Sequence, residues 1–158
     1  AFNSRFEIEI ERASRFNRTV ALILLDIDHL KKINDSFGHP IGDAAICTVA
    51  DVLQSRLRRN DFAARIGGEE FAVLVVEGKA DTSANVARSL LEALRKRDVP
   101  RAGHITASLG IAVYPEDAST RDELFRLADT ALYRAKNSGR NRVVQVRDSD
   151  DESITNVS

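Results

Sequence analysis

Two pairs of carboxylates, far apart in the sequence, are the side chains of this chain best suited to chemistry. Asp26 and Asp28 follow the apolar run 19–25, and the adjacent pair Glu69-Glu70 follows two glycines. A long apolar run predicts a strand buried on both faces, and carboxylates at the end of such a strand are costly unless they bind something positive. Adjacent carboxylates also repel each other unless a cation lies between them. Gly-Gly-Glu-Glu alone would indicate a solvated turn, but together the two pairs favour a metal–nucleotide site.

The second pair is expected at the tip of a β-hairpin. Gly67 and Gly68 are expected to supply positive φ angles there, and the run 71–76 is expected to return as a buried strand. Oxygen ligands suit magnesium, which takes one or two protein carboxylates and also binds phosphate oxygens. An Asp at a strand end that faces a hairpin Glu is the arrangement that two-metal nucleotidyl transfer requires.

Composition limits the size of the fold and the class of partner. A chain of 158 residues is expected to form one domain with a sizeable core. Its 23 basic and 24 acidic side chains are balanced, so neither a nucleic-acid polymer nor a membrane surface is indicated as a partner. Cys47, the one cysteine, is expected to be a buried, reduced thiol, which fits a cytoplasmic domain. Because the first residue is not Met, we expect the chain to belong to a longer protein, which could be soluble or membrane-anchored.

Apolar spacing and turn residues predict alternating helices and strands. Gly38 is expected to end a short helix, and Pro40 to open a longer one. The folded domain is expected to span 1–146, followed by a polar, acidic and disordered tail at 147–158. The predicted helices cover 4–17, 29–35, 40–57, 82–97 and 124–139, and the predicted strands cover 19–26, 62–66, 70–76, 105–114 and 143–146.

This order of elements predicts an α/β (α+β) sandwich, in which helices flank a central, largely antiparallel sheet. The central hairpin excludes a purely parallel, doubly wound sheet. The sequence contains neither Gly-x-Gly-x-x-Gly nor a Walker lysine, so the dinucleotide-binding and P-loop classes both lack their motif.

Taken together, these residues resemble the GGDEF family of diguanylate cyclases, from about residue 3 to residue 146. That family has a palm-like fold related to polymerase and nucleotidyl cyclase catalytic domains, and it condenses two GTP into cyclic di-GMP. The hairpin has Glu-Glu where the family commonly has Asp-Glu, a GGEEF variant that keeps both carboxylates, and the D-x-L-T motif that usually precedes the domain is absent. The matching segments are 25–29, 32–35, 37–39, 42–43, 65–71, 128–133, 135–136 and 139–141.

The resemblance implies a catalytic role for the carboxylates. Asp26, the carbonyl of Ile27 and Glu69 would hold two Mg²⁺ ions per active site, with Mn²⁺ as a possible substitute. Glu69 would also help to deprotonate the attacking 3′-hydroxyl. Glu70 is the second acid of the signature, and its role is less defined.

The resemblance also implies a substrate site. Asn34 and Asp43 match the positions that read guanine, since an amide and a carboxylate complement the donors and acceptors of its edge. The phosphates would be bound by the backbone N–H groups of His29 and Leu30 at a helix start, and by three cationic side chains, Lys31, Lys136 and Arg140. Without the family match, Lys136 and Arg140 would be ordinary cations at a helix C-terminus.

A further implied site binds the product. Arg58 and Asp61 fit the family's inhibitory R-x-x-D motif, at its expected distance before Gly67, and Arg88 could be a secondary arginine for the bound product. The alternative for Arg58 and Asp61 is a solvated charged turn between a helix and a strand.

The favoured function is therefore a diguanylate cyclase that binds one GTP per subunit. Two subunits would meet across a two-fold axis, so that each 3′-hydroxyl attacks the α-phosphate of the other GTP and two pyrophosphates are released. The alternative from another class is a catalytically silent module that binds GTP or cyclic di-GMP and signals by contact. A nucleotide cyclase that acts on a single nucleotide is a third possibility.

Overall fold

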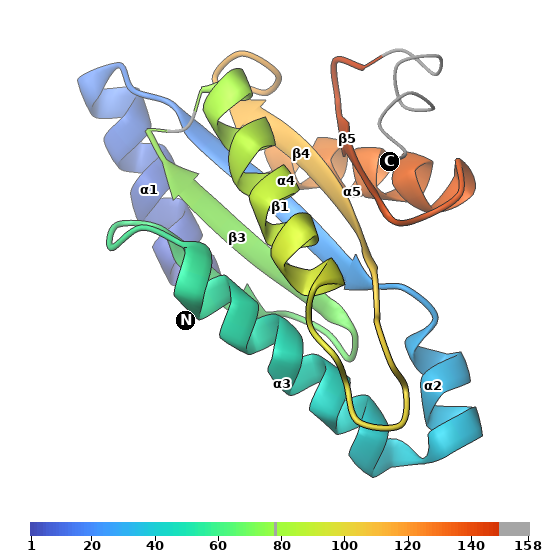
Figure 1. Cartoon of the computed structure of the whole chain (residues 1–158). Coiled ribbons are helices and arrows are strands. Elements are labelled where there is room, and N and C mark those ends of the chain that lie inside the picture. Colours follow the sequence, from blue (N-terminus) through green and yellow to red (C-terminus); the bar gives the residue numbers. More distant parts are fainter. Residues whose placement is uncertain (78, 149–158) are drawn as a thin grey trace.

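The computed structural model describes residues 1–77 and 79–148, which form a sheet with helices on both faces (Figure 1). Each predicted boundary lies within two residues of the observed one, except the start of the last helix, which lies three residues earlier than predicted. The helices are α1 (Phe2–Phe16), α2 (Leu30–Phe37), α3 (His39–Arg56), α4 (Ala80–Arg95) and α5 (Arg121–Asn137). The strands are β1 (Val20–Ile27), β2 (Phe62–Arg65), β3 (Glu70–Val76), β4 (Ala107–Tyr114) and β5 (Arg142–Gln145).

The sheet has the order β2-β3-β1-β4-β5, with β1 at its centre. Pairs β2–β3, β3–β1 and β1–β4 are antiparallel, and β4–β5 is parallel. The expectation of a largely antiparallel sheet is therefore confirmed. In this register Asp26 lies opposite Glu70 of β3 on one side and Ser108 of β4 on the other, so three strands meet at the first carboxylate.

All residues of β1 are buried, because helices cover both faces of the strand. Ile23 and Leu25 face a core cluster built with α3 and α4, whereas Leu22 and Leu24 face a second cluster built with α1 and α5. In Figure 1, α3 and α4 lie in front of the sheet, and α1 and α5 lie behind it. This two-sided burial is the reason that the run is apolar without alternation.

Local signals account for several ends of the helices α2, α3 and α5. Gly38, at φ 92°, ends α2, and Pro40 lies in the first turn of α3, as expected. The hydroxyl of Thr120 caps α5 by accepting from the Glu123 N–H at 3.2 Å. Helix α5 then runs behind β4 and carries Lys136 to the end of β1.

The expectation for Cys47 is wrong, because the structure leaves this side chain exposed. Ala45 and Val49 of α3 face the core. A residue two positions after Ala45 is rotated about 200° around a helix, so Cys47 points outward, and an apolar neighbourhood in the sequence did not predict burial.

The first two residues of the predicted tail, Arg147 and Asp148, contact the folded domain. Arg147 forms ion pairs with Glu116 at 2.7 Å and Asp117 at 3.4 Å, and the carbonyl of Asp148 accepts a hydrogen bond from Arg134 at 2.6 Å. The rest of the predicted tail, 149–158, lies outside the described residues. Among the described helices, none is long and apolar enough to cross a membrane.

Candidate active site

A backbone hydrogen bond brings the hairpin to the end of β1. The N–H of Ile27 donates to the carbonyl of Glu69 at 3.1 Å, next to the register pair of Asp26 and Glu70. The two carboxylate pairs, remote in sequence, therefore meet as predicted.

The hairpin tip, residues 66–69, is closed differently from the prediction. Neither glycine has a φ angle in the left-handed region, so the expected positive φ angles are absent. The carbonyl of Glu70 accepts from the N–H groups of Ile66 and Gly67, and the Arg65 guanidinium donates to the carbonyls of Gly67 and Gly68 at 3.0 and 2.8 Å. A four-residue loop needs no mirror-image turn of the kind that two-residue hairpins use. Gly68 instead leaves open space, since a Cβ built there meets nothing within 4 Å.

Asp26 is almost fully buried, at 5% exposure, and its carboxylate forms an ion pair with the Lys136 ammonium. Burial raises the pKa of Asp26 above that of an ordinary aspartate, and the nearby Asp28 raises it further, while Lys136 and Arg140 act in the opposite direction. The positive charges of α5 and of the loop that follows it therefore partly compensate a carboxylate placed in a costly position.

The two hairpin glutamates also have raised pKa values. For Glu69 the main cause is burial, followed by repulsion from Asp26, and Lys136 and Arg140 oppose the rise. For Glu70 the causes are burial and then repulsion from Asp129 of α5. The site is thus a concentration of negative charge that a cation would relieve.

An open cleft of about 460 Å³ lies in front of these groups. The cleft brings together eight of the residues proposed from the sequence, and it does not include Asn34, Asp43 or Glu70. Its lining comprises Asp26, Ile27, Asp28, His29, Leu30, Lys31, Lys32, Asp35, Glu69, Lys136 and Arg140.

The floor of the cleft includes the start of α2. His29 precedes the helix with a left-handed φ of 59°, and no side chain caps this end. A helix start without a side-chain cap presents backbone donors and the positive end of the helix dipole, which together suit an anionic oxygen.

Asn34 and Asp43 lie beyond the cleft, where α2 packs on α3. The amide oxygen of Asn34 is buried and accepts no hydrogen bond from any residue that the structure describes. A Cβ built on Gly42 would lie 1.7 Å from this oxygen, so only a glycine leaves room for Asn34 here. A buried acceptor without a partner is costly, and the Asn34 oxygen is thus available to accept a hydrogen bond beside Asp43, the next residue of α3.

Asp28 does a different task from the one expected of the first acidic pair. Its carboxylate accepts from the hydroxyls of Thr106 and Ser108, both at 2.6 Å, and from the Asn141 N–H at 2.9 Å. These donors occupy both oxygens of Asp28, whereas among the described residues no hydrogen bond of this kind, from a hydroxyl or a backbone N–H, engages the carboxylates of Asp26 and Glu69, which also line the cleft. Sequence reasoning missed these partners because they are far from Asp28 in the chain. Ser108 lies on β4, Thr106 lies just before β4, and Asn141 lies between α5 and β5.

No three side chains of His, Cys, Asp or Glu converge in a metal-binding cluster within residues 1–77 and 79–148. The expected ligand set contains two side-chain carboxylates and one backbone carbonyl, so it would not form a cluster of this kind. Magnesium commonly completes such a set with water and with phosphate oxygens of the substrate.

The R-x-x-D residues are already paired with each other. The carboxylate of Asp61, whose side chain is 1% exposed, accepts from the backbone N–H and the guanidinium of Arg58 and from the N–H of Val76. Arg58 also donates to the Val76 carbonyl at 2.9 Å. The motif therefore ties the turn before β2 to the end of β3, and it is not the freely solvated turn that we considered.

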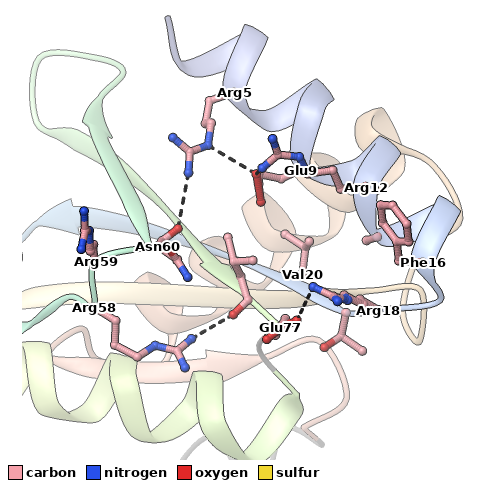
Figure 2. Close-up of a pocket in the computed structure, with 13 residues that line it drawn as sticks. Arg5, Glu9, Arg12, Phe16, Arg18, Val20, Arg58, Arg59, Asn60 and Glu77 are labelled. Carbon is pink, nitrogen blue, oxygen red and sulfur yellow. Dashed lines mark hydrogen bonds and ion pairs between the residues drawn. The ribbon is translucent and has the colours of Figure 1, made fainter.

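Arg58 borders a second cavity, of about 620 Å³, between this turn and α1. Figure 2 shows how Arg5 links the two walls, with an ion pair to Glu9 and a hydrogen bond to the Asn60 carbonyl. Arg88 lies exposed on α4 and does not line this cavity. The arginines that do are Arg5, Arg12, Arg18, Arg58 and Arg59.

Comparison with known proteins gives one family. The family profile described as "Diguanylate cyclase, GGDEF domain" matches residues 1–142. Diguanylate cyclase DgcP of Pseudomonas aeruginosa is 43% identical over 150 residues, which cover 90% of this chain and 22% of that protein. A probable diguanylate cyclase of Escherichia coli K12, DgcT, is 40% identical over 151 residues, which cover 90% of this chain and 32% of that protein. The chain thus spans about a fifth to a third of the length of these relatives.

Solved structures agree with the computed fold over nearly the whole chain. The GGDEF domain of DgcB from Caulobacter crescentus, in complex with cyclic di-GMP, has a TM-score of 0.87 at 34% identity, covering 94% of this chain and 90% of that one. The active GGEEF domain of a diguanylate cyclase from Vibrio cholerae has a TM-score of 0.87 at 31% identity, covering 92% and 94%. The palm-like fold expected from the sequence is therefore confirmed.

Proposed function

This chain belongs to the GGDEF family of diguanylate cyclases, and we propose that it condenses two GTP into cyclic di-GMP with the release of two pyrophosphates. The observation that carries the proposal is the cleft in which Asp26 and Glu69 face Lys136 and Arg140 above the start of α2. Carboxylates for a cation and basic groups for phosphates lie around one space, as phosphoryl transfer requires.

The guanine base would bind where Asn34 and Asp43 lie. The buried, unpartnered amide oxygen of Asn34 is an acceptor that matches a guanine N–H, and the carboxylate of Asp43 is a second acceptor. Adenine presents a different pattern on the same edge, so this pair would favour GTP over ATP.

The phosphates would occupy the cleft. The backbone donors of His29 and Leu30 would bind phosphate oxygens at the helix start, with Lys31 beside them. Lys136 and Arg140 would bind the terminal phosphates, which requires the Lys136 ammonium to share its attraction to Asp26 with the incoming anion.

The residues at the end of β1 fit a divalent cation. Asp26, the Ile27 carbonyl and Glu69 offer oxygen donors only, as Mg²⁺ and Mn²⁺ prefer. The pKa values of Asp26 and Glu69 are raised first by burial and then by repulsion from neighbouring carboxylates, so their charged forms would gain from a cation. Two such ions would polarise the α-phosphate and lower the pKa of the attacking hydroxyl. Glu69 would accept the 3′-hydroxyl proton, since a raised pKa makes its carboxylate a better base. Glu70 would add negative charge from β3.

Catalysis would need a homodimer, because each cleft holds one GTP and the product joins two. Two subunits related by a two-fold axis would bring the clefts face to face. The partners of this domain would then be GTP, cyclic di-GMP and a second copy of itself.

Incubation with GTP and Mg²⁺, followed by chromatography of the products, tests the function. We expect cyclic di-GMP and pyrophosphate, with no dinucleotide from ATP and none from an Asp26→Asn variant. The Vibrio cholerae relative is described as an active GGEEF domain, which favours an enzyme over a silent module. Binding of GTP without any product would support the silent module, and a cyclic mononucleotide would support the third possibility.

A further inference from the structure

Asp28 lies at the centre of a hydrogen-bonded group that the proposed function does not use. We define the Asp28 cluster as Asp28, Thr106, Ser108, Asn141 and Arg95. The hydrogen bonds to the Asp28 carboxylate join three segments of the chain. These are the end of β1, the start of β4 with the residue before it, and residues 138–141 between α5 and β5. Asp28 is 5% exposed, and its own N–H donates to the Thr106 carbonyl at 2.9 Å.

The remaining member of the cluster, Arg95, holds Asn141 from the opposite side. The Arg95 guanidinium donates to the Asn141 side-chain oxygen at 2.8 Å and to its backbone carbonyl at 3.1 Å. The N–H, carbonyl and side-chain oxygen of Asn141 are thus all bonded, two of them to one planar fork. A guanidinium can make this double contact and a lysine ammonium cannot reproduce it.

These hydrogen bonds are needed because the backbone between α5 and β5 adopts unfavourable conformations. Gly139, Arg140 and Asn141 have φ angles of 121°, 63° and 50°. Left-handed conformations of non-glycine residues are costly and persist only where their surroundings impose them. Two anchors impose them on Arg140: its N–H donates to the Ala135 carbonyl at 2.9 Å, and its carbonyl accepts from Arg142 at 3.0 Å. The Asp28 cluster imposes the left-handed conformation of the next residue, Asn141.

We propose that Asp28, Asn141 and Arg95 are positioning residues that fix Arg140 over the cleft and thereby let the site distinguish a nucleoside triphosphate from a diphosphate. The inference rests on the proposed function, in which Arg140 binds a terminal phosphate. Arg140 lines the cleft with Asp26 and Lys136, and the next residue, Asn141, is bonded to the residue two places after Asp26. One carboxylate therefore sets the distance between the metal-binding strand end and the phosphate-binding loop.

The proposed guanine site serves as a control within the same protein. Asn34 and Asp43 lie on α2 and α3, which none of the Asp28 cluster belongs to. A change in the Asp28 cluster should therefore weaken binding of the terminal phosphate while the preference for guanine over adenine persists.

The test measures binding by calorimetry, with GDP and with a GTP analogue that cannot be cleaved between its α and β phosphorus atoms. The variants are Arg95→Lys, which removes the fork, Asn141→Gly, which keeps a left-handed backbone but lacks the side-chain oxygen, and Asp28→Asn. We expect each to bind the GTP analogue about tenfold more weakly, a loss near that of one good hydrogen bond, with a much smaller change for GDP. Arg97→Lys is the matched control, because Arg97 pairs with the exposed Asp51 at 2.6 Å.

Thermal unfolding of every variant separates positioning from stability. A merely structural role would lower the unfolding temperature and weaken GTP analogue, GDP and ATP alike, and that result would overturn the proposal. Unchanged affinities in folded Arg95→Lys and Asn141→Gly would also overturn it, whether or not Asp28→Asn folds. If the parent protein binds no GTP analogue, the proposed function itself fails, a result that is distinct from parent-like binding by the variants.

Discussion

Glu69 lies exposed at the hairpin tip, so a change there should alter the chemistry and leave the fold intact. Glu69→Gln keeps the shape of the side chain and removes its charge and its ability to accept a proton. We expect cyclic di-GMP synthesis to be abolished at saturating magnesium, while the free energy of unfolding stays within about 0.5 kcal/mol of the parent. Glu11→Gln, an exposed change on α1, is the control. Near-normal turnover by Glu69→Gln would remove Glu69 from the site.

The same variant gives a test of the electrostatics by pH. Although the Glu69 side chain is exposed overall, partial desolvation of its carboxylate, followed by repulsion from Asp26, raises its pKa in the folded protein, so the folded state holds this proton more tightly than the unfolded chain does. The resulting stabilisation is complete below the unfolded-state pKa and is lost as pH rises through the folded-state pKa. Without metal, the free energy of unfolding measured in urea should therefore change in favour of Glu69→Gln, relative to the parent, as pH rises from about 4.3, the ordinary pKa of a glutamate, through the raised folded-state pKa. A difference in stability that does not change with pH would contradict the raised pKa.

Replacement of Gly42 by alanine tests the proposed guanine pocket by adding a single Cβ atom. Alanine in a helix is ordinarily favoured over glycine by about 0.5–1 kcal/mol, yet a Cβ at Gly42 would occupy the place of the Asn34 oxygen. We expect Gly42→Ala to displace Asn34 and reduce the preference for GTP over ATP, as Asn34→Ala should. Titration of both nucleotides into the two variants measures this. Full selectivity in both variants would place the guanine pocket elsewhere.

At the scale of elements, α5 must lie close to β4 to bring Lys136 to Asp26. A Cβ on Gly110 of β4 would lie 2.2 Å from the Leu132 nitrogen and 2.4 Å from the Ala128 carbonyl oxygen, both in the α5 backbone. Gly110→Ala should push the helix away and cost about 3 kcal/mol in chemical denaturation. Gly68→Ala is the matched control, with open space around its Cβ. Equal stability of the two variants would show that α5 adjusts freely.

The turn between α3 and β2 is the element proposed to bind the product. Arg58→Ala should weaken inhibition by added cyclic di-GMP about tenfold to a hundredfold, the loss expected for one or two charge-assisted hydrogen bonds, and leave uninhibited turnover intact. Asp61→Ala is a poorer test, because it would remove the buried carboxylate that accepts from the Arg58 N–H and guanidinium and from the Val76 N–H. Arg97→Ala is the control. Parent-like inhibition of Arg58→Ala would exclude this site.

The sequence predicts those helices and strands whose signals lie in their own residues or next to them. Strand β3 was predicted with its observed bounds, since an apolar run after Gly-Gly is sufficient, and Gly38 and Pro40 marked the α2–α3 junction. The site carboxylates followed from their positions at strand ends. The partners of Asp28, the space left by Gly42 and the exposed Cys47 depend on how separate elements pack, and no local pattern contains that information.

At the scale of the whole molecule, the proposed reaction joins two GTP and each subunit would hold one, so the reaction would depend on an encounter between two copies. Specific activity should rise with protein concentration and approach a plateau as dimers fill. A large excess of Glu69→Gln should suppress the parent, because mixed dimers contain one inactive half, whereas an excess of Glu11→Gln should not. Specific activity that is independent of concentration down to the lowest detectable level would favour a preformed dimer or a single-chain reaction.

The central place of β1 also makes one amide proton a natural probe. Strand β1 lies between β3 and β4 and is buried along its whole length, so most of its amides should exchange with deuterated water only when the protein opens globally. The Ile27 amide is bonded to the hairpin instead, through the Glu69 carbonyl. Its exchange rate should therefore report how often the hairpin tip leaves the strand end, and slower exchange on addition of magnesium and GTP would measure, at one proton, how firmly the substrate closes the site.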